Sequence, residues 1–348
     1  MAEIKNLKKH LPERSKFYET GETLEDRTAD GKPINWRADK LKNIEVAEML
    51  ARLKKDKDGR VLNCGTLLEF KNRADGTKKL NRAYFCKNRL CPSCNKRKAW
   101  KRTGEISAVL DKAMQENPTG RFIFLTLTVE NAYTAEQLAR EIKEINSAFS
   151  KMIRYKKIAK NLLGYIRATE VTVNHENKQA GKYHHHIHAI MFVKATYFSK
   201  NNYITQVEYT ELWQKALRSE TPNIVNVKVI KPDADGNYTS AAMETGKYTV
   251  KDADYMTGRY LADLETVSDL SEALKGTRDI SYGGILRKIK QDISKISITD
   301  NDTESETAGG QIIQAHWYWT KENYYIWRQK TKDQADKKDA KQMTQKIS

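Results

Sequence analysis

Four of the seven histidines of the chain lie within five residues, in the segment 182–193 (KYHHHIHAIMFV). Three of them alternate with other residues and an apolar run follows, which predicts a strand because successive strand side chains point to opposite faces. His184, His186 and His188 would share one face of this strand, and His185 would lie on the other. Neutral imidazoles side by side on a strand can bind one divalent metal ion. The alternative is a surface strand that carries its histidines by chance.

A carboxylate ligand for such a metal is available from the preceding predicted strand, 164–173. If the hairpin of the two strands closes symmetrically about its loop, Glu170 lies opposite His186, and directly opposed residues share a sheet face. Glu170, His186 and His188 then form a predicted two-histidine, one-carboxylate site. His184 is either a fourth ligand or a supporting group, and a solvent-facing Glu170 is the alternative. Mixed nitrogen and oxygen ligands suit Mn²⁺ or Mg²⁺ holding a phosphate, and they suit Zn²⁺ as well.

A metal that holds a phosphodiester needs a nucleophile, and the segment 240–256 offers one. This segment is predicted as a helix, on which Glu244, Tyr248, Lys251 and Tyr255 share one face at spacings i, i+4, i+7 and i+11. A carboxylate beside a phenol suggests covalent catalysis, in which tyrosine attacks the phosphorus and Glu244 later activates a second attacking group. Lys251 would stabilise the charge on the phosphate. The alternative is an amphipathic helix with a tyrosine anchor and an ion pair.

All four cysteines, Cys64, Cys86, Cys91 and Cys94, lie within 31 residues of one another. The spacing of the last two (CPSC) lets two thiolates bind one tetrahedral ion, which predicts a structural zinc site with four cysteine ligands. Two disulfides are the competing interpretation, although the cytosol is reducing. A redox-active CxxC motif is a weaker interpretation, because it leaves Cys64 and Cys86 without a role.

The charge balance points to a polyanionic partner. The chain has 62 lysines and arginines against 45 acidic residues, a net charge of +17. No run approaches 18 apolar residues and the N-terminus lacks the apolar core of a signal peptide, so nucleic acid in a cytoplasmic setting is favoured over a membrane surface. A merely soluble basic protein is the alternative. Phosphate contacts are predicted for the start of a basic helix at 95–116, although a solvated face explains these residues almost equally well: Lys96, Arg97, Lys98, Lys101 and Arg102.

The elements that position these residues follow the order β-α-β-β-α-β. Thr134 and Gln137 form a capping pattern for the first helix. Thr126 and Thr128, which alternate on the first strand, either line the same sheet face as the histidines or reflect ordinary strand propensity, and propensity is favoured. This order is the ferredoxin-like split motif, an antiparallel sheet backed by helices, so an α+β fold is predicted. The predicted elements are a strand at 122–130, a helix to about 158, strands at 164–173 and 183–193, a helix at 208–220 and a strand at 224–230.

Five segments are predicted along the chain. A polar arm (1–42) precedes a zinc-binding DNA-contact module (43–118), which holds a helix at 43–55 and strands at 61–70 and 80–86 around a turn at 74–76. The nuclease domain (119–298) comes next, with helical stretches at its end, followed by an acidic linker (299–310) and a C-terminal helical and aromatic extension, which is an aromatic segment with a basic tail (311–348). The aromatic residues at 315–327 either stack on bases or pack against the main core, and packing is favoured.

Three motifs taken in order, FLTLTVE, HHHIHAIMFV and METGKYTVKDADYM, resemble those of the rolling-circle plasmid replication initiators of Gram-positive bacteria. These proteins form the single-tyrosine branch of the HUH endonuclease superfamily. The resemblance covers roughly residues 60–300, including FCKNRLCPSC. It implies a ferredoxin-like nuclease core and a metal-dependent, site- and strand-specific nick at a double-strand origin. It also implies a 5′-phosphotyrosyl intermediate and the help of a host helicase and DNA polymerase.

The same resemblance assigns roles to individual residues. His186 and His188 match the paired histidine ligands, and Glu170 matches the acidic third ligand. Tyr248 matches the nucleophile, with Tyr255 as its substitute, and Glu244 matches the carboxylate that assists termination by water. Relatives often have proline where this chain has His185, which leaves the ligand geometry intact.

Two other functions stay open at this point. A transposase or conjugative relaxase of the same superfamily would share the tyrosine and the metal but would not act at a replication origin. A non-catalytic, zinc-anchored DNA-binding regulator would use the histidines structurally. A zinc deaminase is discounted, because the chain has no His-x-Glu motif upstream of a CxxC. Formation of a homo-oligomer is left open.

Overall fold

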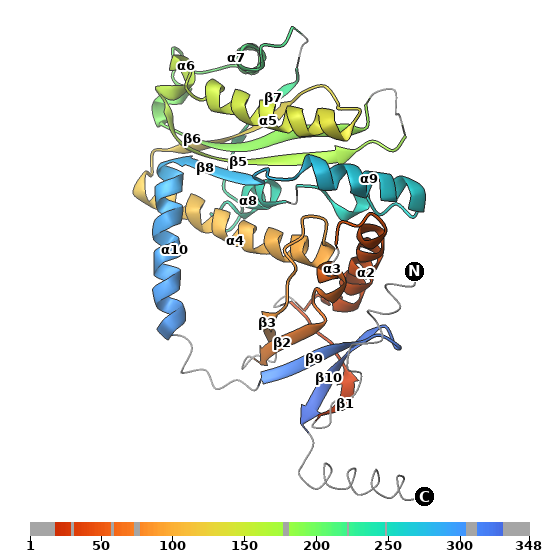
Figure 1. Cartoon of the computed structure of the whole chain (residues 1–348). Coiled ribbons are helices and arrows are strands. Elements are labelled where there is room, and N and C mark those ends of the chain that lie inside the picture. The colour runs from red at the N-terminus through yellow and green to blue at the C-terminus, as the bar shows by residue number, and fades with distance from the viewer. Residues whose placement is uncertain are drawn as a thin grey trace, which may run out of the picture. The chain divides into compact units, whose positions relative to one another are not determined.

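The computed structural model describes residues 18–28, 31–56, 59–72, 77–176, 181–220, 223–247, 249–303 and 312–329. The chain forms a mixed α+β structure with two antiparallel five-stranded sheets (Figure 1). It divides into two compact units, Met1–Cys94 with Glu306–Ser348, and Asn95–Ser305. The division therefore falls after the last cysteine, and the C-terminal segment belongs to the same unit as the N-terminal one. None of the described helices is long and apolar enough to cross a membrane.

The sheet of the second unit has the strand order β7-β4-β6-β5-β8. Its strands are β4 (Arg121–Thr128), β5 (Leu162–Val173), β6 (Tyr183–Val193), β7 (Val225–Ile230) and β8 (Ile280–Gly284). With α5 (Ala135–Met152) and α7 (Gln206–Leu217), the chain follows the predicted β-α-β-β-α-β order. The edge strand β8 is a difference, since this region was expected to be helical. Because β8 is short and pairs with a distant segment, β5, its own sequence carries little strand signal.

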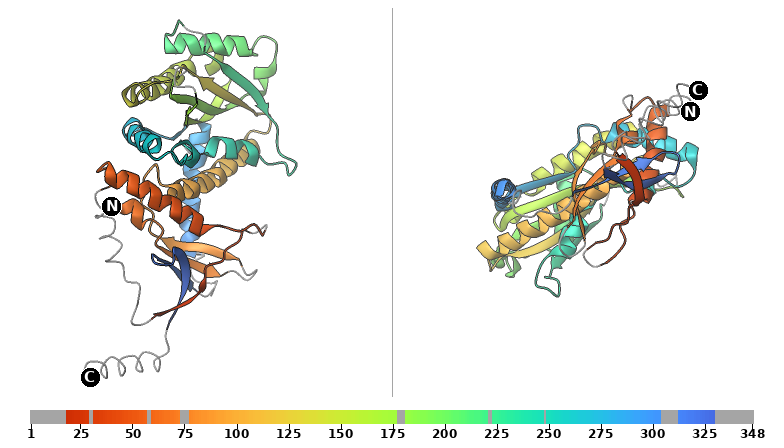
Figure 2. Two further views of the ribbon diagram at one scale, coloured as in Figure 1. Left: turned by 90° about the vertical axis from the view of Figure 1, so that its right-hand side faces the viewer. Right: turned by 90° about the horizontal axis from the view of Figure 1, so that it is seen from below.

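Helices cover both faces of this sheet (Figures 1 and 2). Odd-numbered residues of β4, such as Leu125, pack with α5 and α7 through Phe149 and Trp213. Even-numbered residues face α4 (Pro92–Glu116), α8 (Thr239–Gly246) and α10 (Ile285–Thr303), where Phe122 and Leu110 are buried. The alternation of strand side chains thus assigns the histidines with even numbers to the face that carries α4 and α8.

Helix starts agree with their capping residues, whereas two predicted helix ends are wrong. The Thr134 hydroxyl accepts a hydrogen bond from the Gln137 backbone, and Thr205 forms a capping box that opens α7. The first helix ends at Met152 rather than near 158, and the short α6 (Lys156–Ala159) follows it. The helix expected at 240–256 ends at Gly246, and among the described residues a 3₁₀ turn, η3 (Asp252–Asp254), follows before α9 (Tyr260–Ala273).

Close packing accounts for the glycine at the end of α8. A Cβ atom at Gly246 would lie 2.9 Å from Thr103 Oγ1, so only glycine lets α8 approach α4 this closely. Glycine also favours the end of a helix. Glu244 and Lys251 therefore do not share a helix face as expected, and Tyr248 lies outside the described residues.

The first unit takes strands from both ends of the chain. Its sheet has the order β1-β10-β9-β2-β3, with β1 (Tyr18–Thr23), β2 (Leu67–Asn72), β3 (Lys78–Ala83), β9 (Ile312–Tyr318) and β10 (Asn323–Gln329). The helices α2 (Trp36–Arg52) and α3 (Arg60–Asn63) complete it. The aromatic segment 315–327 is thus a hairpin of this sheet and not part of a helical extension as expected, because its residues pair as the strands β9 and β10. Trp317 and Tyr324 are buried.

Several sequence-based limits differ here. The polar arm predicted at 1–42 contains β1 and the start of α2, and the strand predicted from residue 61 begins at 67 because α3 precedes it. The predicted linker 299–310 begins inside α10, and its residues 304–310 lie outside the described residues. The same is true of the predicted turn at 74–76 and of the tail beyond residue 329.

Candidate functional site

The hairpin of β5 and β6 has the register that its symmetry predicted. Glu170 pairs with His186 and Ala168 with His188. On the other side of β6, Thr128 pairs with His186 and Thr126 with His188. Three neighbouring strands thus bring these side chains to one sheet face, the face that α4 and α8 cover.

Three ligand atoms converge on this face. His186 Nε2 and His188 Nε2 lie 3.0 Å apart, and Glu170 Oε2 lies 3.4 Å from the first and 3.0 Å from the second. All three residues are buried, with less than a tenth of each residue exposed. Two imidazole nitrogens and a carboxylate oxygen within this distance form a donor set that fits a divalent metal ion.

The electrostatics keep Glu170 ionised. Burial raises the pKa of Glu170, but hydrogen bonds from His186, His188 and Lys251 outweigh it and hold the pKa well below its usual range. Lys251 Nζ lies 3.1 Å from Glu170 Oε1. Burial opposes the charge of Lys251, yet the hydrogen bond to Glu170 raises the pKa of that ammonium overall. The carboxylate is therefore available as a metal ligand on one oxygen and paired on the other.

Thr126 contacts a candidate ligand that sequence reasoning did not connect to it. Its Oγ1 lies 3.3 Å from His188 Nδ1. Donation of the Nδ1 hydrogen to this hydroxyl leaves the lone pair of Nε2 free to bind a metal. Thr128 differs, because its hydroxyl donates to the backbone oxygen of Ile224 at 2.8 Å. Cross-strand pairing is the signal that would have singled out Thr126.

His184 and His185 have other surroundings. His184 Nδ1 lies 2.8 Å from Asn131 Oδ1, and burial lowers the pKa of His184, which favours its neutral form. Among the described residues, His184 does not belong to the group that could hold a metal ion. His185 faces the opposite side, fully buried, with Nε2 3.4 Å from Glu141 Oε2.

Two residues predicted to be catalytic, Glu244 and Lys251, come from the segment after β7 and lie near the candidate ligands. Glu244 Oε1 lies 3.9 Å from His188 Nε2, and Glu244 forms an ion pair with Lys247. Thr249 accepts a hydrogen bond from the Val171 backbone at 2.7 Å, which fastens this part of the chain beside β5. Tyr255, the substitute nucleophile, is fully buried. Burial of Tyr255 disfavours a role in attacking a phosphodiester.

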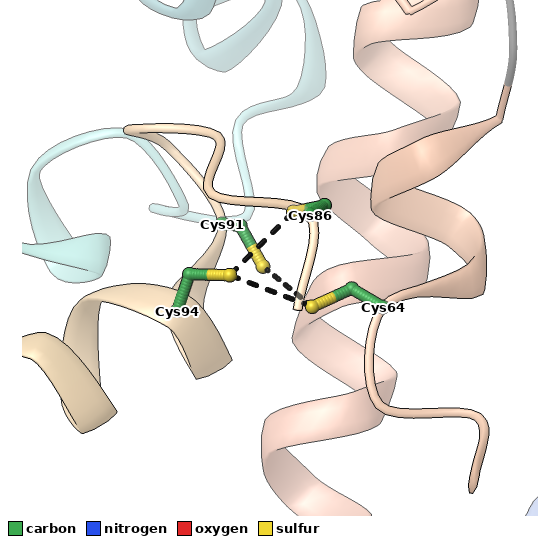
Figure 3. A group of neighbouring side chains, drawn as sticks. All are labelled: Cys64, Cys86, Cys91 and Cys94. Carbon is green, nitrogen blue, oxygen red and sulfur yellow. Dashed lines mark hydrogen bonds between the residues drawn. The ribbon is translucent and has the colours of Figure 1, made fainter. Parts of the chain in front are cut away.

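The four cysteine side chains meet in the first unit (Figure 3). Their sulfur atoms lie 3.5 to 3.6 Å apart in the pairs Cys64–Cys94, Cys86–Cys94 and Cys64–Cys91. All four are buried and none forms a disulfide. Four sulfurs around a tetrahedral zinc, each about 2.3 Å from it, would stand about 3.8 Å apart. The cluster therefore fits a zinc ion, and it does not fit the disulfide interpretation.

Two buried polar residues of α2 hold the cysteine segments, and sequence reasoning missed both. Lys40 Nζ donates to the carbonyl oxygens of Leu62 at 2.6 Å and Cys64 at 2.8 Å. Burial lowers the pKa of Lys40 to about 7, against the opposing effect of the cysteines. Asn43 Oδ1 accepts from the Cys91 thiol and from the Ser93 backbone, both at 3.2 Å. A lysine and an asparagine on the side of a helix that faces the core are the sequence signal that would have identified them, because these residue types are rarely buried.

The basic residues of α4 separate into two groups. Lys98 and Arg102 both form ion pairs with Asp279, a buried carboxylate. Lys96 lies over the ring of Trp100, 5.6 Å from its centroid. Arg97 and Lys101 are exposed. Internal pairing thus occupies part of the set predicted to contact DNA.

Comparison with known proteins shows similarity to replication proteins of bacteria. A family model described as "Replication protein" matches residues 77–332. The "Protein rep" of Lactiplantibacillus plantarum is 40% identical over 319 residues, which cover 88% of this chain and 99% of that protein. The "Protein rep" of Streptococcus pneumoniae serotype 2 is 35% identical over 313 residues, 87% of this chain and 95% of that protein. A "Replication protein" of Staphylococcus aureus is 38% identical over 228 residues, 63% of this chain and 95% of that protein. No solved structure is significantly similar to the chain.

Proposed function

Because this chain belongs to the replication protein family, we propose that it initiates rolling-circle replication of a plasmid by nicking one strand at the double-strand origin. The observation that carries the proposal is the convergence of Glu170, His186 and His188 on one point of a buried sheet face. Glu244 and Lys251 reach the same group from the segment that contains the tyrosine.

The second unit is, in this proposal, the ferredoxin-like nuclease core of the HUH superfamily. The strand order β7-β4-β6-β5 in one antiparallel sheet supports it, as do α5 and α7 on a single face. The edge strand β8 extends that sheet by one member.

Glu170, His186 and His188 would hold Mn²⁺ or Mg²⁺, and Cys64, Cys86, Cys91 and Cys94 would hold a structural zinc ion. The nuclease metal, when bound, supplies Lewis-acid polarisation of a phosphate oxygen. The protein residues position the ligands: Thr126 orients His188, and Glu170 stays ionised because of its three hydrogen-bonding partners.

Tyr248 is the proposed nucleophile. Its phenol oxygen attacks the phosphorus, the bond from phosphorus to the 3′ oxygen breaks, and the phenol proton ends on the leaving 3′ hydroxyl. The products are a free 3′ end and a 5′-phosphotyrosine. Lys251 neutralises charge on the phosphate. At termination Glu244 accepts a proton from water, whose oxygen attacks the phosphorus of the regenerated origin and displaces a new 3′ hydroxyl. This hydroxyl attacks the phosphotyrosine, the bond from phosphorus to the tyrosine oxygen breaks, the tyrosine takes the hydroxyl proton, and the strand is rejoined as a circle. A host polymerase would extend the 3′ end while a helicase unwinds the duplex.

The test uses supercoiled plasmid that carries the origin of the replicon encoding this chain. With Mn²⁺ we expect an open circle with protein attached to its 5′ end, and neither product without metal. Tyr248→Phe should abolish both products, and His188→Ala should abolish nicking while Tyr248 stays intact. Nicking by Tyr248→Phe together with its loss in Tyr255→Phe would overturn the choice of nucleophile. Origin binding without any nick would favour the non-catalytic regulator, and activity on a transfer origin or transposon end alone would favour a relaxase or transposase.

A further inference from the structure

Two segments of the second unit meet at the end of the sheet where β6 ends. The first holds α6 and the residue after it, and the second runs from Lys194 through the 3₁₀ helix η2 (Ala195–Phe198) to the start of α7. Lys194 Nζ donates to the carbonyl oxygen of Lys160 at 3.1 Å, and Lys160 Nζ donates to that of Asn201 at 3.5 Å. These contacts place the two segments side by side.

Three aromatic rings lie together in the second segment. Tyr197 is buried, and the centroid of its ring lies 5.0 Å from that of Phe198 and 5.8 Å from that of Tyr203. Phe198 and Tyr203 are 39% and 46% exposed, and their ring centroids lie 6.5 Å apart with planes that differ by 37°. Large aromatic side chains that are exposed together are typical of a contact surface.

The fold holds these rings in place through hydrogen bonds of the same segment. The Tyr197 hydroxyl donates to the carbonyl oxygen of Ile204 at 3.2 Å. The side-chain amide of Asn202 donates to the carbonyl oxygen of Thr196 at 2.9 Å and to the hydroxyl of Ser199 at 3.1 Å. Groups that are already ordered lose less conformational entropy when they bind, so the segment is prepared for contact with a partner.

The charge around the rings selects the class of partner. The stretches 151–161 and 194–207 contain no acidic residue. Glu208, in the first turn of α7, forms an ion pair with Lys157 of α6 (Figure 1). Lysines beside exposed aromatic rings match the phosphates and the bases of a nucleic acid strand. Three such lysines are exposed here: Lys160, Lys194 and Lys200.

We propose that this region, the η2 surface, binds single-stranded DNA. Its two exposed rings stack on bases and its three lysines contact phosphates. A single strand is favoured over a duplex because the faces of its bases are open to aromatic side chains. At about 3.3 Å per strand residue, the start of the surface lies about 20 Å beyond His188 along β6. The inference thus goes beyond the proposed function, since this DNA contact lies away from the nick. The η2 surface consists of Lys160, Lys194, Phe198, Lys200 and Tyr203.

The central test removes the aromatic rings and keeps apolar side chains in their place. The double variant Phe198→Leu with Tyr203→Leu should bind a fluorescein-labelled oligothymidine about tenfold more weakly than the wild type. Tyr203→Phe keeps the ring and is the matched control, so it should bind like the wild type. Val207→Ala removes an exposed apolar side chain at the start of α7 and should also leave the affinity unchanged. Melting temperatures show whether each variant is folded.

Charge gives a measurement that leaves the packing of the rings intact. The logarithm of the affinity for a single strand falls linearly with the logarithm of the salt concentration. Lys194→Gln and Lys200→Gln should each reduce the slope by about 0.7, the value for one phosphate contact. Lys143→Gln removes an exposed charge from α5 and should leave the slope unchanged. Wild-type slopes in both Lys194→Gln and Lys200→Gln would contradict the proposal.

Each outcome decides the proposal. Binding is measured without added Mn²⁺ or Mg²⁺, so that it does not depend on nicking. Wild-type affinity for oligothymidine in the double variant would overturn the η2 surface and leave the proposed function standing. Equal losses for a duplex of the same length would overturn it as well, because stacking needs unpaired bases.

Other partners of the η2 surface would give different results. Loss of self-association of the double variant in light scattering, with oligothymidine binding intact, would make the surface an interface between copies. Loss of binding to anionic lipid vesicles, again with oligothymidine binding intact, would make it a membrane-contact surface. A wild-type chain that binds oligothymidine through this surface but does not nick the origin plasmid would support the η2 surface and contradict the proposed function.

Discussion

Lys251 and Glu170 form an ion pair in which Nζ lies 3.1 Å from Oε1, the carboxylate oxygen that does not face the histidines. Oε2 is thereby left to His186 and His188. One carboxylate thus connects the proposed metal ligands to the residue proposed to meet the phosphate.

This arrangement predicts opposite effects of Lys251→Met on metal binding and on nicking. The substitution removes a positive charge beside a metal ligand, so Mn²⁺ should bind equally well or more tightly. Nicking should slow about tenfold or more, because the phosphate loses its counter-charge. Calorimetry measures the first quantity and a plasmid nicking assay the second. Weaker Mn²⁺ binding in this variant would show that Lys251 acts on the metal site rather than on the phosphate.

The contact of Thr126 with His188 predicts a metal-binding defect in Thr126→Val. Loss of the hydroxyl removes the acceptor for the Nδ1 hydrogen, and a lost ligand-orienting partner typically weakens metal affinity about 10- to 100-fold. Thr126→Ser should restore the affinity, since it keeps the hydroxyl. Thr128→Val is the control on the same strand, because its hydroxyl bonds to Ile224. Equal defects in Thr126→Val and Thr128→Val would indicate general damage to the strand instead.

The position of Lys40 predicts that its positive charge helps the four cysteines to retain zinc. A zinc ion bound by four thiolates has a net charge of −2, and the buried ammonium of Lys40 lies at the carbonyl of one of these cysteines. Lys40→Met should release zinc faster to a colorimetric chelator and lower the melting temperature. Lys42→Met, an exposed lysine of the same helix, should do neither. If Lys40→Met retained zinc like the wild type, the counter-charge role would be refuted.

His316 predicts a loss of stability in acid. Burial lowers the pKa of His316 from 6.5 to about 4, and its ring stacks on Trp327 with centroids 3.4 Å apart. As the pH falls below 6.5, the unfolded chain binds a proton at this residue that the folded chain does not bind. The free energy of unfolding therefore decreases until about pH 4. His316→Phe should remove this part of the pH dependence. Urea unfolding of both proteins across this range measures the difference, and parallel curves would contradict the assignment.

The hairpin of β5 and β6 could be predicted from the sequence, whereas the structure of the segment 240–256 could not. The register that pairs Glu170 with His186 follows from a symmetric loop and a strand alternation that are both local. The spacing of Glu244, Tyr248 and Lys251 predicted a helix that continues beyond Gly246, but α8 ends at Gly246, where it packs closely on Thr103 of α4. That contact joins distant parts of the chain and has no local signature.

The first unit was harder to predict for the same reason. The pairing of β1 with β10 joins residues near the two ends of the described chain. The local sequence of neither strand indicates which strand it pairs with. Lys40 was missed because the start of its helix was placed at residue 43 rather than at Trp36. The cluster of the four cysteines, by contrast, could be predicted from their spacing alone.

The composition of the first sheet has a consequence for biosynthesis. Between β3 and β9 the ribosome must make the whole second unit, so β2 lacks one neighbour and β1 lacks its only partner until the hairpin β9–β10 emerges. The second unit can therefore complete its own sheet while the first unit of the nascent chain is still incomplete. A message cut short after α10 would yield a polypeptide that contains Glu170, His186 and His188 but has an open strand edge. Proteases that degrade incomplete proteins would then recognise this polypeptide by its open strand edge.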